Sequence, residues 1–64
     1  MRLTKPMFFL LLDMESEPLD VVESNEKLDN LLFLERHGLI RRLEKNIMFD
    51  YRFELTEKGR KEII

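Results

Sequence analysis

Hydrophobic positions recur with the period of an α-helix in the middle of the chain. Leu28, Leu31, Leu32 and Glu35 stand at i, i+3, i+4 and i+7, and Leu34 joins the same broad stripe, whose apolar members are the four leucines. Ser24 or Asn25 can cap the start of this helix, with Glu26 near its positive end. Gly38 supplies the left-handed residue that ends helices. The pattern therefore predicts a helix between about residues 25 and 37.

Beyond Gly38 the hydrophobic period changes to two, which is typical of β-strands. The alternation places Ile40 and Leu43 on the inner face of a hairpin, opposite Tyr51, Phe53 and Leu55. It places Arg41, Arg52 and Glu54 on the outer face. Lys45-Asn46 is a plausible turn nucleus, and a longer loop would also include Ile47 through Asp50. This segment is predicted to be a β-hairpin.

Three shorter segments surround this helix and hairpin. Thr4 and Pro6 favour a helix start, and the apolar run predicts a helix over 5–14 that is wedged into the core. Pro18 ends it, and the apolar cluster over 19–23 predicts a second helix of one or two turns. Thr56 is expected to cap a final helix that reaches about Ile63, interrupted by Gly59.

Together these residues resemble the winged helix-turn-helix superfamily, and in particular the small bacterial and archaeal regulators of the multiple-antibiotic-resistance and phenolic-acid-regulator types. The resemblance covers roughly the C-terminal half of the chain. It rests on Leu31, Leu34, Glu35, Gly38, Leu39, Ile40 and Arg41, on Asp50-Tyr51-Arg52, and on Leu55-Thr56-Glu57-Lys58-Gly59-Arg60. It implies an α+β fold: a minimal winged helix-turn-helix with three short helices, a C-terminal β-hairpin wing and a final short helix. It also implies a DNA-binding transcriptional regulator.

The chain departs from the usual pattern of this superfamily at three places. The second helix has only residues 19–23 available. The outer face of the recognition helix holds Glu26, Lys27, Asp29, Asn30 and Phe33, where family members usually carry Ser, Thr, Arg, Lys or Gln. The wing carries Ile47, Met48 and Phe49, where exposed polar residues are usual. The scaffold positions are kept, and part of the usual DNA-reading surface is replaced.

Length and composition indicate a single domain over residues 1–64 with a small core. The chain is 44% hydrophobic and 38% charged, which is a globular and not a disordered composition. The apolar run from Met7 to Leu12 is too short to span a bilayer, and we expect a cytoplasmic protein with no membrane association. A core this small gains from self-association, and a homodimer is expected.

The net charge of −2 hides an asymmetry between the two halves of the chain. From Asp13 to Glu35 there are eight acids and one base, and from Arg36 to Glu62 there are eight bases and five acids. Such a distribution favours oriented contacts, including contacts between copies. A solubilising surface with scattered lysines explains the same numbers.

Candidate DNA contacts combine the recognition helix with the hairpin. Lysine and arginine neutralise phosphates, and asparagine can pair with an adenine edge in the major groove. The candidates are Lys27, Asn30, Arg41, Arg42, Lys45 and Arg52. Glu26 and Asp29 oppose this interpretation, because acids beside the same groove would face phosphate. The alternative is that the bases form a solvated hairpin surface.

A second set of residues predicts contact with a protein. An apolar hairpin tip at Ile47, Met48 and Phe49 is a contact surface for another protein or a second copy, unless it closes over the core. Phe33 is expected to lie off the core stripe and to extend this surface. These residues support the alternative function, a winged-helix protein-interaction module without nucleic-acid binding.

Enzymatic and metal-dependent functions have no support in the sequence. The chain has no cysteine and one histidine, His37, for which we expect a capping or packing role. The acids from Asp13 to Glu23 lack the spacing of a calcium loop. No nucleophile–base pair or phosphate-binding glycine loop is present. We expect neither catalysis, nor a metal, nor a cofactor, and the expected partners are double-stranded DNA, a second copy and a protein partner.

Overall fold

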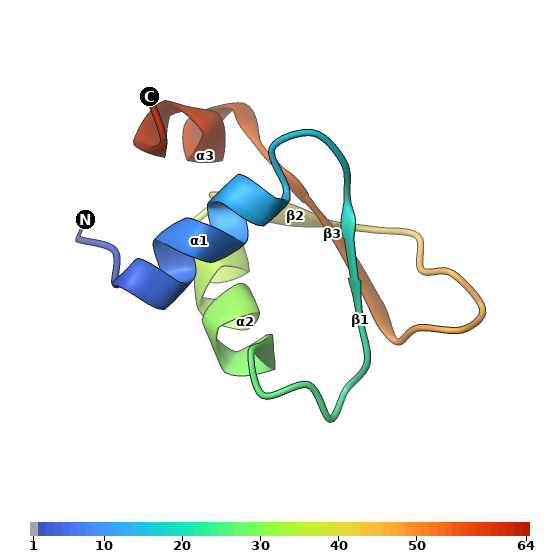
Figure 1. Cartoon of the computed structure of the whole chain (residues 1–64). Helices are drawn as coiled ribbons and strands as arrows, with labels where there is room; N and C mark the ends of the chain where they lie inside the picture. The colour runs from blue at the N-terminus through green and yellow to red at the C-terminus, as the bar shows by residue number, and fades with distance from the viewer. Residues whose placement is uncertain (1) are drawn as a thin grey trace.

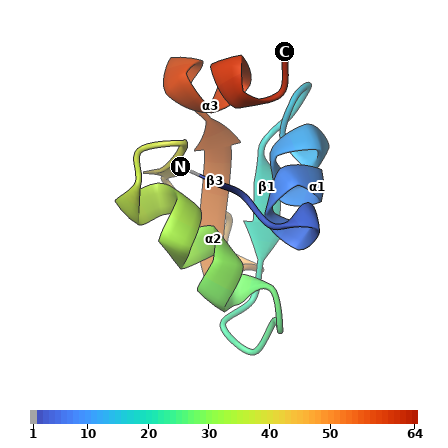
Figure 2. The same ribbon diagram turned by 90° about the vertical axis from the view of Figure 1, so that its left-hand side faces the viewer.

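The computed structural model describes residues 2–64, which contain three helices and one three-stranded antiparallel sheet. The order along the chain is α1 (Lys5–Asp13), β1 (Leu19–Val21), α2 (Leu28–Arg36), β2 (Ile40–Leu43), β3 (Tyr51–Leu55) and α3 (Glu57–Glu62). The strand order is β1-β3-β2. The helices α1 and α2 lie against one face of the sheet, and α3 follows the end of β3 (Figures 1 and 2). The fold is therefore α+β, as expected.

The core lies between α1, α2 and the inner face of the sheet. Every element except α3 contributes large apolar side chains to it, and all are less than a tenth exposed: Leu10, Leu11, Met14, Val21, Leu31, Leu34, Leu39, Ile40, Phe53 and Leu55. Each fully buried side chain of this kind contributes about 1.5–3 kcal/mol of transfer free energy. The predicted inner positions Ile40, Phe53 and Leu55 are confirmed.

Helix α1 begins where the sequence predicts and is less buried than expected. The Thr4 hydroxyl accepts a hydrogen bond from the Met7 amide at 3.4 Å, which caps the helix. Leu10 and Leu11 face the core. Phe9 is 57% exposed and Leu12 is 38% exposed. The expectation that α1 is wedged into the core holds for the face of Leu10 and Leu11 but not for its outer face, which neither the sheet nor α2 covers.

The segment over 19–23 contains the strand β1, over Leu19–Val21, and not the predicted second helix. Leu19, Asp20 and Val21 pair with Phe53, Arg52 and Tyr51 of β3. The amide of Asp50 donates to the Val21 carbonyl at 3.1 Å, and its carboxylate accepts from the Glu23 amide at 2.7 Å. Pairing with β3 satisfies the backbone of this segment better than one turn of isolated helix could.

Helix α2 starts about three residues later than predicted. Asn25 does not cap it; its side-chain oxygen accepts from the Lys27 amide at 2.8 Å, which forms a local turn. Lys27 stands at the N-cap position without a side-chain cap. At the other end Gly38 has a φ of 77°, which confirms the predicted glycine stop. His37 is the C-cap residue, which confirms one of its two expected roles.

The hairpin pairs Ile40 with Leu55, Arg41 with Glu54, Arg42 with Phe53 and Leu43 with Arg52. Side chains alternate between the faces of a strand. Arg42 therefore shares the helix-covered face with Phe53, and Leu43 lies on the outer face. The prediction that Leu43 points inward was wrong, because Arg42 takes that face. The loop spans the longer of the two predicted ranges, with a turn at Asn46–Phe49 closed by the Phe49 amide and the Asn46 carbonyl at 3.1 Å.

Helix α3 closes the end of the molecule next to the C-terminus of α2. The Thr56 hydroxyl donates to the Gly38 carbonyl at 2.7 Å and accepts from the Gly59 amide at 3.1 Å. The Lys58 ammonium donates to the His37 carbonyl at 3.0 Å. The predicted Thr56 cap is confirmed, and the same residues satisfy carbonyls that the end of α2 leaves unpaired.

In residues 2–64 no helix has both the length and the apolar character needed to cross a membrane.

Candidate functional site

Two of the three hairpin arginines face the outer, helix-free side of the sheet and are paired with acids there. Arg41 forms an ion pair with Glu54, its cross-strand partner. Arg52 lies 3.5 Å from Asp20, its cross-strand partner on β1. The Arg41 side chain is 69% exposed, whereas that of Arg52 is 37% exposed and its Nε is buried. Exposed pairs of this kind contribute only about 0–1 kcal/mol. Arg41 can thus exchange Glu54 for another anion at low cost.

The third hairpin arginine has a structural position. Arg42 donates through Nε and Nη2 to both carboxylate oxygens of Glu35 on α2, at 3.1 and 2.8 Å. Its guanidinium also lies 4.9 Å from the ring centroid of Tyr51 and 5.8 Å from that of Phe53. A bidentate pair and two ring contacts hold this side chain in one place. Arg42 therefore ties α2 to the sheet.

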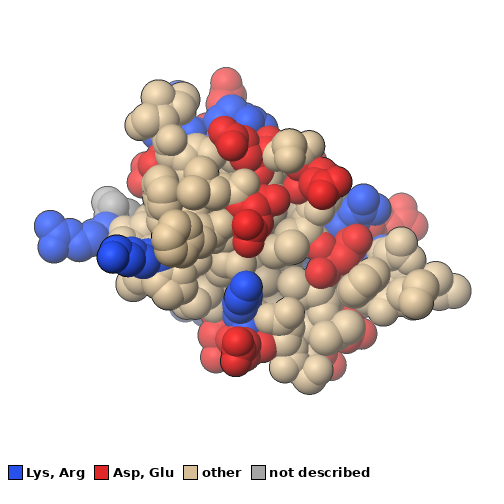
Figure 3. Space-filling model, viewed as in Figure 1, with Lys and Arg blue, Asp and Glu red and all other residues tan. Residues whose placement is uncertain are grey.

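The remaining DNA-contact candidates lie on the start of α2 and in the loop that follows β2. Lys27 is exposed at the start of α2, Asn30 is half-buried one turn later, and Lys45 is exposed in the loop between β2 and β3. Within residues 2–64, neither Lys27 nor Lys45 has an ion-pair partner. The structure therefore does not bring the six candidates together in one patch. On the face shown in Figure 3, acidic and basic side chains are interspersed.

The apolar hairpin tip is open to solvent. Ile47 is 97% exposed and Met48 is 78% exposed, whereas Phe49 is half-buried. Ile47 and Met48 therefore do not close over the core. In Figure 1 the loop between β2 and β3 reaches beyond the rest of the chain at the right, and Figure 3 shows an uncharged protrusion at that place.

No family model, curated protein or solved structure matches this chain. The case for any function therefore rests on the residues and their geometry.

Phe33 does not extend the tip surface. It is half-buried and packs against the core, which contradicts the expectation that it lies off the core stripe. Its ring centroid lies 4.3 Å from that of His37. One helical turn separates the two residues, and their contact covers the end of α2. This packing also confirms the second role expected for His37.

Sequence reasoning overlooked the outer face of α1. Lys5, Pro6, Phe9, Leu12 and Asp13 are exposed and recur at the spacing of a single helix face. The signal was present in the sequence, because positions 5, 9, 12 and 13 lie on one side of a helix. The apolar run around them concealed it.

Acidic residues gather along the N-terminal half without forming a metal site. In the described part of the chain, no three histidine or acidic side chains are grouped closely enough to hold a metal ion.

Proposed function

We propose that this chain is a minimal winged-helix domain that binds double-stranded DNA as a transcriptional regulator. The observation that carries the proposal is the arrangement of α2. This helix ends at Arg36 and leads through Gly38 into the β2–β3 hairpin, and β1 completes the sheet in the order β1-β3-β2. In a winged-helix protein these elements are the recognition helix and the wing. The segment before α2 is a turn, so the helix-turn-helix is abridged.

The contacts of each side chain divide the six candidate DNA-binding residues into two groups. Arg42 and Arg52 are assigned to holding the fold, because Arg42 is fixed against Glu35 and Arg52 is half-buried beside Asp20. Lys27, Asn30, Arg41 and Lys45 are assigned to DNA. Lys27 and Lys45 form no ion pair within residues 2–64, and Arg41 is mostly exposed in a pair that phosphate can replace.

The acids at the start of α2 restrict the mode of binding. Glu26 and Asp29 are both exposed beside Lys27. A carboxylate can accept from the amino group of cytosine, but it repels phosphate. We therefore propose that Lys45 and Arg41 provide the phosphate contacts through the hairpin, and that α2 adds few of them. The affinity should be low and strongly dependent on salt.

Replacing Arg41 and Lys45 together with Ala tests this assignment. The double variant should weaken duplex binding to a similar degree across sequences, because phosphate contacts carry no sequence information. The slope of log K against log salt should fall by about 0.9 for each phosphate that is no longer neutralised. Fluorescence anisotropy with a labelled duplex measures both quantities.

Lys61→Ala with Arg60→Ala is the matched control, because it removes the same charge from α3, which lies away from the hairpin tip (Figure 1). If both double variants reduce the slope equally, net charge and not the hairpin determines binding, and the assignment fails.

A second candidate function is supported by the exposure of Ile47 and Met48. An open apolar tip flanked by polar residues is typical of a protein contact. In this alternative the same fold recruits a protein partner through the hairpin tip and does not bind nucleic acid.

A further inference from the structure

The outer face of α1 is apolar in its middle and charged at its two ends. Phe9 stands at the centre, with Pro6 before it and Leu12 after it, and all three are exposed. Lys5 lies at the first residue of the helix and Asp13 at the last. We name these five residues the α1 stripe.

The charges of the α1 stripe are placed against the preference of the helix itself. A helix carries partial positive charge at its N-terminus and partial negative charge at its C-terminus, so it favours acids first and bases last. In α1 the first turn has no acid and the last turn has no base. Lys5 and Asp13 therefore weaken α1 in the isolated chain. A neighbour with the opposite charge at each end would offset this cost.

A second copy of the same helix, running antiparallel, is such a neighbour. With Phe9 of one copy opposite Phe9 of the other, Pro6 faces Leu12 at both sides of the two-fold axis. The same register places Lys5 of each copy opposite Asp13 of the other. We propose that the chain forms a two-fold symmetric dimer through the α1 stripe, with an apolar centre closed by two Lys5–Asp13 ion pairs.

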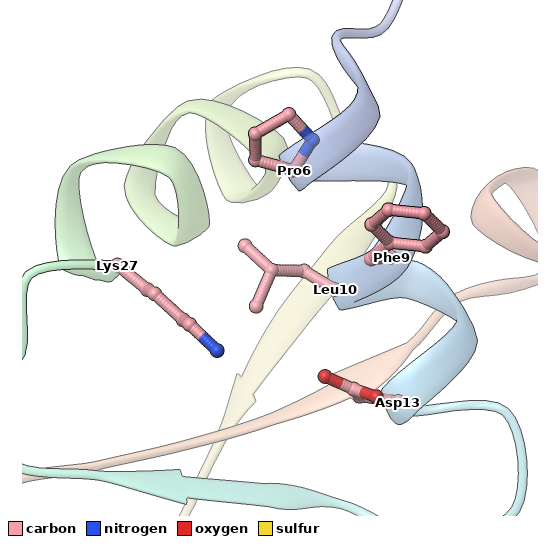
Figure 4. Close-up of a pocket in the computed structure, with 5 residues that line it drawn as sticks. All are labelled: Pro6, Phe9, Leu10, Asp13 and Lys27. Carbon is pink, nitrogen blue, oxygen red and sulfur yellow. The ribbon is translucent and has the colours of Figure 1, made fainter.

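A groove beside the α1 stripe provides space for the second copy. It has a volume of about 250 Å³ and is lined by Pro6, Phe9, Leu10, Asp13 and Lys27. Figure 4 shows these α1 side chains along one wall and Lys27 on the other. The volume is below the about 300–1,000 Å³ of small-molecule pockets, which favours a side chain as occupant. In the proposed register Leu12 of the second copy lies opposite Pro6, at the mouth of this groove.

The size of the contact determines its strength. A nine-residue helix is only about 14 Å long, so the buried area lies below the about 1,000 Å² of stable interfaces. A weak dimer is therefore expected, with a dissociation constant between about 10 µM and 1 mM. The dimer does not require DNA and is measured without it, so its failure would leave the proposed function standing.

Charge exchange is the sharpest test, with sedimentation velocity over this concentration range as the measurement. Lys5→Asp and Asp13→Lys should each weaken the dimer about tenfold, because each turns two attractive pairs into repulsive ones. Both substitutions improve the fit of charge to the helix dipole, so neither should unfold α1. The chain with both substitutions restores opposite charges across the axis and should recover the dimer to within about threefold.

The apolar centre has a matched control in Val22. Leu12 and Val22 are both 38% exposed, and only Leu12 belongs to the α1 stripe. Leu12→Ser should weaken the dimer about tenfold or more, whereas Val22→Ser and Met48→Glu should leave it unchanged. The proposal is overturned if the wild-type chain is monomeric at 1 mM, if the charge exchange fails to restore the dimer, or if Met48→Glu dissociates it.

Discussion

The two glycines are required for different physical reasons. Gly38 has a φ of 77° and room for a Cβ, since the nearest atom to an added Cβ would be the Lys58 Cδ in ordinary van der Waals contact at 3.9 Å. Gly59 has an ordinary helical backbone and is buried. An added Cβ there would lie 2.0 Å from the Leu39 carbonyl oxygen and 2.8 Å from a Leu55 methyl carbon. Glycine is therefore required at position 38 by the backbone conformation, and at position 59 by the close packing between α3 and the start of β2.

Alanine substitutions at these two positions should differ in cost. Gly38→Ala should lower the free energy of unfolding by about 1–2 kcal/mol, the cost of a left-handed non-glycine residue. At Gly59 the helix gains about 1 kcal/mol from alanine, but the clash with backbone exceeds it, and a net loss of about 3 kcal/mol is expected. Urea denaturation measures both. Equal losses, or a larger loss at Gly38, would show that α3 does not pack on Leu39 as described.

At the scale of elements, the sequence predicts the helix ends that depend on residues close together along the chain. The cap at Thr4, the glycine stop at Gly38 and the cap at Thr56 each depend on one residue and its near neighbours, and all three are confirmed. The strand β1 was missed because its partner lies about thirty residues away on β3. The alternation of Leu19, Asp20 and Val21 was a strand signal, but three residues are too few to define a period.

The position of Arg42 could not be predicted from the sequence either, because it also depends on pairing between strands. A charged residue next to Arg41 predicts an exposed surface, and only the pairing register shows that Arg42 faces the helices. Its partners there are Glu35 and the Tyr51 and Phe53 rings, which come from two other elements. The sequence could thus name the individual candidate residues. It could not show that Glu35 and Asp20 would hold Arg42 and Arg52 in structural ion pairs.

Arg42 should contribute more to stability than its neighbour on the same strand. Arg42→Ala removes the bidentate pair and two cation–π contacts and should cost about 1–2 kcal/mol. Its side chain is 47% exposed, and solvent screening keeps the figure low. Arg41→Ala removes one exposed pair and should cost less than about 0.5 kcal/mol. Thermal unfolding followed by circular dichroism compares them. A smaller loss for Arg42→Ala would contradict its role in joining α2 to the sheet.

At the scale of the molecule, the proposed dimer and the proposed hairpin contacts to DNA use different surfaces. The helix α1 lies on the side of the chain away from the hairpin tip (Figure 1). Two copies joined through α1 would leave both hairpins open, as paired half-sites require, whereas Lys27 at the start of α2 would lie beside the dimer contact. Pairing also doubles the phosphate contacts available to a domain whose net charge is −2.

The exposed Ile47 and Met48 are the feature that DNA binding explains least well. Two mostly exposed apolar side chains at a hairpin tip do not neutralise phosphate. They favour the protein-interaction module if the hairpin bases prove inactive. Duplex binding therefore separates the two functions.

The most direct measurement is a titration of a labelled, mixed-sequence 20-base-pair duplex with the wild-type chain between about 20 and 200 mM salt. Binding through Lys45, Arg41 and their counterparts in a second copy should appear at low salt. It should weaken with a log–log slope of about −2 to −4, corresponding to two to four phosphate contacts at about 0.9 each. No binding at 20 mM salt, or binding that does not change with salt, would contradict the proposed function.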